Sequence, residues 1–271
     1  MPHRTGVMFR PEWPPEELPA FARRAEDDGF DELWLVEDCF LVGGLTMAAT
    51  GLALTDRLRV GIGLLPAAMR NAALAAMEIA GLGRLHPGRL AVAFGHGVEP
   101  WMRQIDARPP DRLAALEEVV SAVRALLRGS NVSADGAFVR LEDVQLQHLP
   151  DPPPAILIGT TGPRALAVAG RSADGFLLAE GSGPPAVEWA TDATLATSES
   201  ASRLVVNAED KATAPAACCW CEALVRVVRV SCRFSSRPDI RLARAGACSA
   251  AQPIRLRRAP RHCRDDAPTL P

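Results

Sequence analysis

The chain has 271 residues, a formal net charge of −2, 48% hydrophobic residues and 23% charged residues. This length and composition allow a large core in one or two domains, and the charge near zero argues against nucleic acid or a polybasic membrane surface as a partner. The longest near-apolar stretch, residues 72–83, is too short to span a bilayer, and the first ten residues lack the apolar segment of a signal peptide, so we expect a cytoplasmic location.

Short strands and helices alternate along residues 1–208. Apolar runs predict strands at 5–9, 33–36, 59–65, 90–94, 155–158, 176–179 and 204–207. Apolar residues at helical spacing predict helices at 14–29, 45–54, 71–85, 109–127, 163–171 and 187–195. Residues 130–149 interrupt this order with short β segments around Asp135 and Gly136.

The alternation predicts an α/β fold, because each parallel strand needs a crossover connection. Two architectures fit the pattern, a doubly wound sheet and a (β/α)₈ barrel. No G-x-G-x-x-G motif opens the first strand-to-helix turn, which weakens the dinucleotide-binding version of the first architecture. The barrel is therefore favoured.

The composition changes near residue 200. Residues 1–200 contain 17 arginines, 26 acidic residues and one cysteine, for a net charge of −9, whereas residues 201–271 contain 13 basic residues, 6 acidic residues and six cysteines, for a net charge of +7. The sequence therefore divides into a barrel at 1–208 and a tail rich in Arg, Cys and Pro at 209–271, in which only 223–230 resembles a strand.

The tail cysteines allow more than one interpretation. A C-C-x-C run without paired histidines is a weak zinc pattern, and an odd number of cysteines disfavours a disulfide scaffold. We favour translation in a shifted frame of an Arg- and Ala-biased gene.

Chemically active side chains follow two of the predicted strands. Catalytic groups in parallel barrels gather where strands end. Glu37, Asp38 and Cys39 follow the second strand, and at most one of the two carboxylates faces the barrel mouth unless the chain turns there. His96 follows the fourth strand between Gly95 and Gly97, where it can reorient and titrate near neutral pH.

Glycine-rich segments follow two further strands. The third strand contains Gly61 and Gly63, which permit a kink or the close approach of a ligand. The fifth runs into residues 159–164, where small residues open a helix whose N–H groups can hold a phosphate.

Each of these features also has a plainer interpretation. Glycines at such turns commonly serve the turn alone. Glu37 fits a buried pair with an arginine, and His96 fits a loop residue that binds water. Phe40, Trp34 and Trp101 are expected to be packing residues.

Several segments resemble the luciferase-like (bacterial luciferase-type) flavin or coenzyme F420-dependent oxidoreductases. They are AEDDGFDELWLVED at 25–38, VGIGLLP at 60–66 with Arg70-Asn71, HPGRL at 86–90, GHGV at 95–98, Trp101-Met102, GTTGPR at 159–164 and ADG at 173–175. They occur in the family's order over about residues 5–205 and are closest to its F420-dependent actinobacterial branch.

The resemblance implies a luciferase-like (β/α)₈ TIM barrel with F420, or alternatively FMN, across its C-terminal rim. It places the following residues at the cofactor: Asp38 and Cys39 beside the ring, Gly63 and Leu64 where the family often has a cis peptide, Gly95, His96 and Gly97 near ring and substrate, and Gly159, Thr160, Thr161, Gly162 and Pro163 in the phosphate loop.

The implied activity is hydride transfer between F420 or FMN and a small organic substrate. We expect His96 to act as acid or base, with Asp38 as the alternative or as its orienting partner. Cys39 is a further candidate, although some relatives carry His there, and at the position where others have a Glu this chain has Val98. The expected partner is a small molecule, and a homodimer is compatible with the resemblance.

A family member of full length continues through an eighth strand and helix, whereas this chain continues into the tail. The sequence therefore predicts a barrel that is incomplete at its C-terminal end, with two free sheet edges. Two alternatives stay open: an inactive remnant that binds cofactor without turnover, and a barrel lyase or isomerase that shares only the fold.

Overall fold

The computed structural model describes residues 4–178, 182, 184–197, 202–209 and 227–234. Eight strands form a closed barrel in the order β1-β10-β9-β8-β7-β4-β3-β2. Seven of them, from β1 through β2, β3, β4, β7 and β8 to β9, pair in parallel. The predicted barrel is confirmed, and the doubly wound alternative is wrong.

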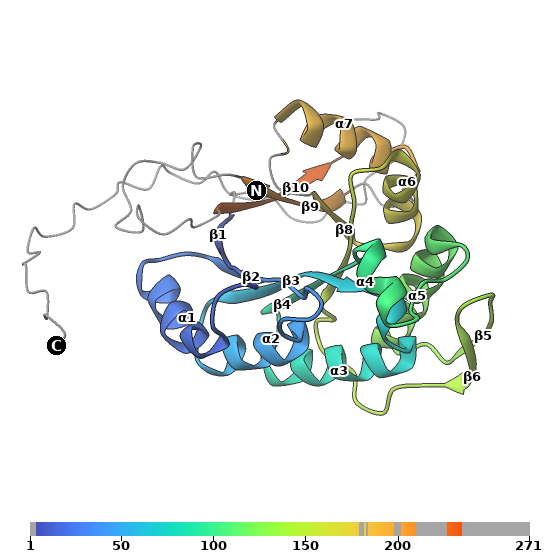
Figure 1. Ribbon diagram of the computed structural model, residues 1–271, viewed down its shortest axis with the longest axis horizontal. Coiled ribbons are helices and arrows are strands. Elements are labelled where there is room, and N and C mark those ends of the chain that lie inside the picture. The colour runs from blue at the N-terminus through green and yellow to red at the C-terminus, as the bar shows by residue number, and fades with distance from the viewer. Residues whose placement is uncertain (1–3, 179–181, 183, 198–201, 210–226, 235–271) are drawn as a thin grey trace, which may run out of the picture. The chain divides into compact units, whose positions relative to one another are not determined.

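The elements follow the predicted order (Figure 1). The strands are β1 (Arg4–Phe9), β2 (Glu32–Leu35), β3 (Arg59–Pro66), β4 (Leu90–Gly95), β5 (Val132–Asp135), β6 (Arg140–Val144), β7 (Ala155–Gly159), β8 (Gly175–Leu178), β9 (Ser202–Glu209) and β10 (Val227–Phe234). The helices are η1 (Pro15–Glu17), α1 (Leu18–Asp27), α2 (Gly44–Ala53), η2 (Ala67–Met69), α3 (Ala72–Leu85), α4 (Glu99–Gln104), α5 (Arg112–Leu127), α6 (Pro163–Ser172) and α7 (Pro184–Leu195). Only η2 and α4 have no predicted counterpart.

The eighth position of the barrel differs from the prediction. β10 is antiparallel to both of its neighbours, with Val228 opposite Gly6 of β1 and opposite Ala208 of β9. The expected free edges of β1 and β9 are therefore paired. The barrel is still incomplete in the sense predicted, because the residues that the structure describes contain neither an eighth parallel strand nor a helix after α7.

Most of the tail lies outside the described residues, including five of its six cysteines. The division between 208 and 209 therefore stays a prediction. Within the described ranges, we find no helix that could serve as a membrane span.

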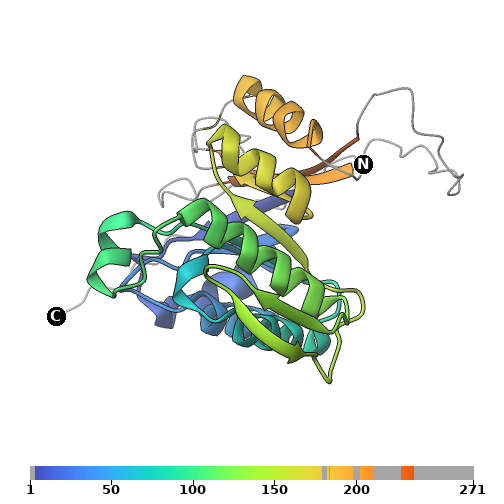
Figure 2. The same cartoon turned by 90° about the vertical axis from the view of Figure 1, so that its right-hand side faces the viewer.

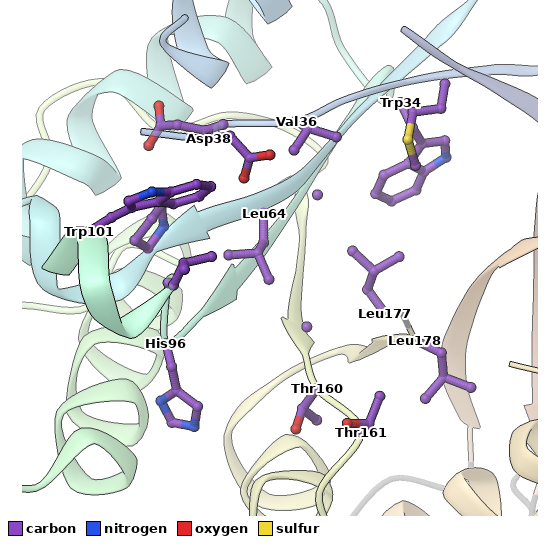
Figure 3. A pocket seen from close by; sticks show the side chains of 17 residues that line it. Trp34, Val36, Asp38, Leu64, His96, Trp101, Thr160, Thr161, Leu177 and Leu178 are labelled. Carbon is purple, nitrogen blue, oxygen red and sulfur yellow. The ribbon is translucent and has the colours of Figure 1, made fainter. Parts of the chain in front are cut away.

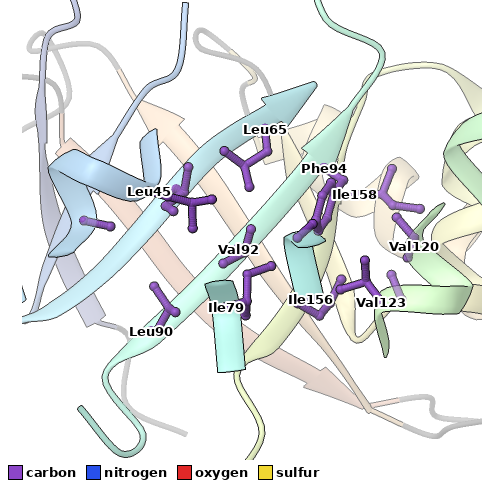
Figure 4. Packing of buried hydrophobic residues seen from close by; sticks show 14 of the residues in the cluster. Leu45, Leu65, Ile79, Leu90, Val92, Phe94, Val120, Val123, Ile156 and Ile158 are labelled. Carbon is purple, nitrogen blue, oxygen red and sulfur yellow. The ribbon is translucent and has the colours of Figure 1, made fainter. Parts of the chain in front are cut away.

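Helices cover the outside of the strands and bury the main core. Figure 2 shows α5, α6 and α7 side by side along one side of the barrel. In Figure 4, Val92 and Phe94 of β4 point toward Ile79 of α3 and Val120 of α5. The strand β4 alternates these large residues with small ones, Ala91, Ala93 and Gly95, so its large side chains face the helices and its small ones face the barrel interior.

The longest helix begins with a side-chain cap. Asp111 accepts hydrogen bonds from the backbone N–H groups of Leu113 and Ala114, both at 3.0 Å. Such a cap satisfies N–H groups that have no partner within the helix. This explains why α5 starts at Arg112 instead of at the predicted Pro109.

A single large side chain, Trp34, occupies much of the barrel interior. An ideal Cβ atom at Gly61 would lie 2.5 Å from the Trp34 ring, and one at Gly6 or Gly63 would lie 3.3 Å from it. Trp34 packs there with Met8, Ala93 and Leu157. Glycines in β1 and β3 therefore provide the space that the indole fills.

An ion network at the amino ends of the strands holds this indole. Trp34 Nε1 donates a hydrogen bond of 2.9 Å to Glu32 Oε2, and Glu32 is only 4% exposed. Arg4 Nε lies 2.7 Å and Arg59 Nε 3.7 Å from Glu32 Oε1. The carboxylate is thus compensated by two guanidinium groups and fixes the position of Trp34.

Replacement of Gly61 by alanine tests this packing. Gly61→Ala places a methyl group against the indole, and we expect a loss of about 1–3 kcal/mol in the free energy of unfolding by urea denaturation. Gly81→Ala is the matched control, because nothing lies within 4 Å of its Cβ position in α3. The control should gain about 0.5–1 kcal/mol from helix propensity. Equal stabilities of the two variants would contradict this description of the interior.

Candidate active site

A cavity of about 640 Å³ opens at the carboxyl ends of the strands (Figure 3). It is lined by Met8, Trp34, Val36, Glu37, Asp38, Gly63, Leu64, Pro66, His96, Gly97, Val98, Trp101, Gly159, Thr160, Thr161, Leu177 and Leu178. In the figure Leu64 lies near the middle, with Asp38 and Trp101 on one side and Thr160 and Thr161 on the other. Most of the predicted site residues are therefore brought together.

Leu64 reaches this place through an irregular segment of β3. The pairing of β3 with β4 shifts register between Ile62 and Leu65, and the Gly63–Leu64 peptide is cis. An ideal Cβ atom at Gly95 or Gly159 would lie 2.5 Å from Leu64 Cδ2. These two glycines therefore make room for the Leu64 side chain, and Gly95, which was predicted to contact the cofactor, does not line the cavity.

The turn after β2 separates the two carboxyl groups and the thiol. Arg70 donates two hydrogen bonds to Glu37, of 2.5 and 2.6 Å, and the Gly44 N–H donates a third of 2.7 Å. The predicted buried pair between Glu37 and an arginine is confirmed. Cys39 does not line the cavity, because its Sγ lies 3.6 Å from Met69 Sδ.

Asp38 is the carboxyl group of this segment that faces the cavity without an ion pair among the described residues. Burial, together with the negative charge of Glu12, raises its pKa. Burial also raises the pKa of the Cys39 thiol, and the charges of Glu37 and Asp38 add to this. Asp38 therefore keeps a proton to higher pH than an ordinary aspartate, while Cys39 is disfavoured as a thiolate.

His96 follows β4 and lines the same cavity. Its Nδ1 atom is buried, and within the described part of the chain it has no hydrogen-bond partner. Burial lowers its pKa and the positive charge of Arg112 adds to this, although the backbone of Arg112 and the charge of Asp111 act in the opposite direction. The imidazole is therefore neutral at pH 7 and able to accept a proton. The next residue, Gly97, has a φ of +68°, which favours glycine.

The loop between β7 and α6 forms a candidate anion site. Thr160 Oγ1 accepts a hydrogen bond of 3.1 Å from the Gly162 N–H, and no side chain caps the N-terminus of α6 at Gly162. Thr160 and Thr161 line the cavity, whereas Gly162 and Pro163, the next two residues, do not. Uncapped N–H groups at a helix N-terminus attract a phosphate.

Two tryptophans and several aliphatic residues were missed as site residues. The expectation that Trp34 packs is confirmed, but Trp34 and Trp101 both line the cavity as well. Phe40, assigned to packing as well, is 62% exposed. Their place in the sequence indicates that they line the site. Trp34, Val36 and Leu177 lie in predicted strands, and the carboxyl ends of these strands form the site. Among the described residues, no group of His, Cys, Asp and Glu could hold a metal ion.

The raised pKa of Asp38 predicts an effect on stability. Ionised Asp38 is less favourable in the folded than in the unfolded chain, so its cost appears as the pH rises above about 3.9, the pKa of an unfolded aspartate. Asp38→Asn should therefore have a higher Tm than the wild type at pH 7, by differential scanning fluorimetry, and the same Tm at pH 3. Asp135→Asn, at a side chain that is 99% exposed, is the control and should change little. A lower Tm of Asp38→Asn at pH 7 would contradict the assignment.

The comparison with known proteins places these residues in a family. A family model described as Luciferase-like monooxygenase matches residues 1–220. The chain is 33% identical over 184 residues to an F420-dependent glucose-6-phosphate dehydrogenase of Kribbella flavida, covering 62% of this chain and 54% of that protein. It is 28% identical over 174 residues to a 5,10-methylenetetrahydromethanopterin reductase of Methanolobus tindarius, covering 64% and 53%.

Solved structures agree on the fold. The coenzyme F420 dependent tetrahydromethanopterin reductase of Methanopyrus kandleri superposes with a TM-score of 0.63 and 20% identity, covering 72% of this chain and 60% of that one. The chain spans about half the length of the curated relatives it matches. Since the family model covers most of the sequence, and the cavity lies where its barrel strands end, the chain belongs to the luciferase-like monooxygenase family.

Proposed function

We propose that the chain is an oxidoreductase that transfers a hydride between coenzyme F420 and a small organic substrate. The observation that carries the proposal is that one cavity joins an uncapped helix N-terminus, a histidine of lowered pKa and a carboxyl group of raised pKa. The relatives named F420-dependent glucose-6-phosphate dehydrogenase favour F420. FMN is the alternative, because the family as a whole includes flavin enzymes with the same barrel.

The described residues fit a flat cofactor that carries a phosphate. Thr160, Thr161 and the first turn of α6 would hold the phosphate, with Gly159, Gly162 and Pro163 shaping the loop. Gly63 and Leu64 would support the ring, and Gly97 lines the cavity with its Cα packed against Met102 and Pro66. The apolar walls around Leu64 exclude water from that surface.

Bound F420 supplies hydride acceptance and donation, and the protein supplies the proton transfer. In the oxidative direction the neutral His96 accepts the proton of a substrate hydroxyl group, and in the reductive direction it returns that proton. Asp38, which binds its proton more tightly than usual, orients the substrate hydroxyl group or replaces His96 as the donor. Cys39 has no part in this scheme, since its thiol packs on Met69.

Cofactor titration and a histidine variant test the function. We expect F420 to bind more tightly than FMN in a fluorescence titration, and F420 to be reduced with at least one member of a panel of alcohols that includes glucose 6-phosphate and cyclohexanol. His96→Ala should lower kcat about 10²- to 10⁴-fold with little change in F420 affinity.

The control variant is His86→Ala, because His86 follows α3 and does not line the cavity. It should retain the activity of the wild type. Full turnover by His96→Ala would rule out the proposed acid or base. Binding of F420 without turnover of any alcohol would identify the inactive remnant, and binding of neither cofactor would refute the proposal.

We further propose that the chain forms a homodimer through the outer face of α2 and α3. Leu74, Met77 and Leu85 are 44%, 58% and 75% exposed and form one stripe on α3. The adjacent helix α2 contains no charged residue. An exposed apolar stripe is normally covered by a partner, and a second copy of the chain related by a two-fold axis would cover the stripe on α3 with its own.

A charge placed on this face tests the dimer. Met77→Glu should convert the dimer to a monomer in size-exclusion chromatography with light scattering, because an unpaired carboxylate would be buried at the contact. Ile105→Glu is the control, since Ile105 is exposed and apolar but lies after α4. A monomeric wild type, or a variant Met77→Glu that remains dimeric, would exclude this face as the interface.

A further inference from the structure

We propose that the cavity accepts a neutral, largely apolar substrate and discriminates against phosphorylated sugars. The inference deepens the proposed function, because it assumes that substrate and cofactor share this cavity. It departs from the relatives that are named for glucose 6-phosphate.

The walls of the cavity carry little that would bind a dianion. Among the described residues that line it, nine are apolar and none is Lys or Arg. The apolar ones are Met8, Trp34, Val36, Leu64, Pro66, Val98, Trp101, Leu177 and Leu178. A phosphate group that enters such a cavity loses hydration without gaining a cationic partner, which is costly.

The charges that do face the cavity are negative. Asp38 faces it without an ion pair among the described residues, and Glu12 lies close enough to act on the Asp38 carboxyl group. Glu37 is compensated by Arg70 and Glu12 pairs with Arg10, so ionised Asp38 is the negative charge on this wall that no cation among the described residues balances. Such a wall repels a dianion and is indifferent to a neutral molecule.

Several arginines close to the ends of the barrel strands already have carboxylate partners. Arg103, Arg108 and Arg112 all pair with Glu99, at 3.3 Å for Arg108 and 3.2 Å for Arg112. Arg70 is held by Glu37 and lies 3.9 Å from Glu78. Among the described residues, the anion site left is the uncapped N-terminus of α6, whose first turn contains Arg164, and the proposed cofactor phosphate occupies it.

A comparison of three compounds as ligands and substrates tests the inference. F420-loaded protein is titrated with cyclohexanol, glucose and glucose 6-phosphate by saturation-transfer NMR, and turnover is followed with the same compounds. We expect cyclohexanol to bind and to be oxidised, with kcat/KM at least about tenfold above that of glucose 6-phosphate. Binding or turnover of glucose 6-phosphate that equals or exceeds that of cyclohexanol would overturn the inference. Failure of F420 to bind is a separate result, which refutes the proposed function instead.

A charge added to the cavity provides the matched test. Val98 lines the cavity and is 44% exposed, so Val98→Arg places a cation at its mouth without burying it. This variant should bind glucose 6-phosphate about two- to fivefold more tightly than the wild type does. Ile105→Arg adds the same charge outside the cavity and should leave that affinity unchanged. Equal affinities of the two variants for glucose 6-phosphate would show that the lack of a Lys or Arg among the described lining residues does not set the selectivity.

Discussion

The barrel depends on one buried interaction, the hydrogen bond of the Trp34 indole to Glu32 inside a network with Arg4 and Arg59. It fixes a large ring across the interior, and the neighbouring strands accommodate the ring with Gly61 and other small residues. The same ring forms part of the wall of the cavity. The Trp34 side chain therefore sets both the packing of the barrel and the shape of the site. A substitution of Trp34 or of Glu32 is expected to alter the packing and the site together.

Above Trp34, the site depends on where small residues stand. Leu64 can lie in the middle of the cavity because Gly95 of β4 and Gly159 of β7 have no side chains that would occupy its place. The polar groups then follow from the ends of the strands: Asp38 after β2, His96 after β4 and Thr160 after β7. Their environments differ, since burial favours the neutral form of both Asp38 and His96, while α6 favours an anion near Thr160. Proton transfer and phosphate binding are thus assigned to different residues of one cavity.

Much of this arrangement follows from the sequence, because strand periodicity and the rule that sites form at the carboxyl ends of barrel strands are local and general. They were sufficient for the barrel, for Asp38 and His96, and for the Thr160 loop. Three features depended on contacts between distant residues instead. The pairing of Cys39 with Met69, the filling of the Gly95 position by Leu64, and the antiparallel course of β10 all require tertiary structure. The short helix α4 was missed because one turn carries no periodic pattern.

The central claim is that F420 occupies this cavity with its phosphate at the N-terminus of α6. A crystal structure of the protein grown with F420 tests it most directly. The account predicts the phosphate within hydrogen-bond distance of Thr160, Thr161 or the first N–H groups of α6, and the ring against Leu64, beside Asp38 and His96. A cofactor bound elsewhere, or a phosphate turned away from α6, would contradict it.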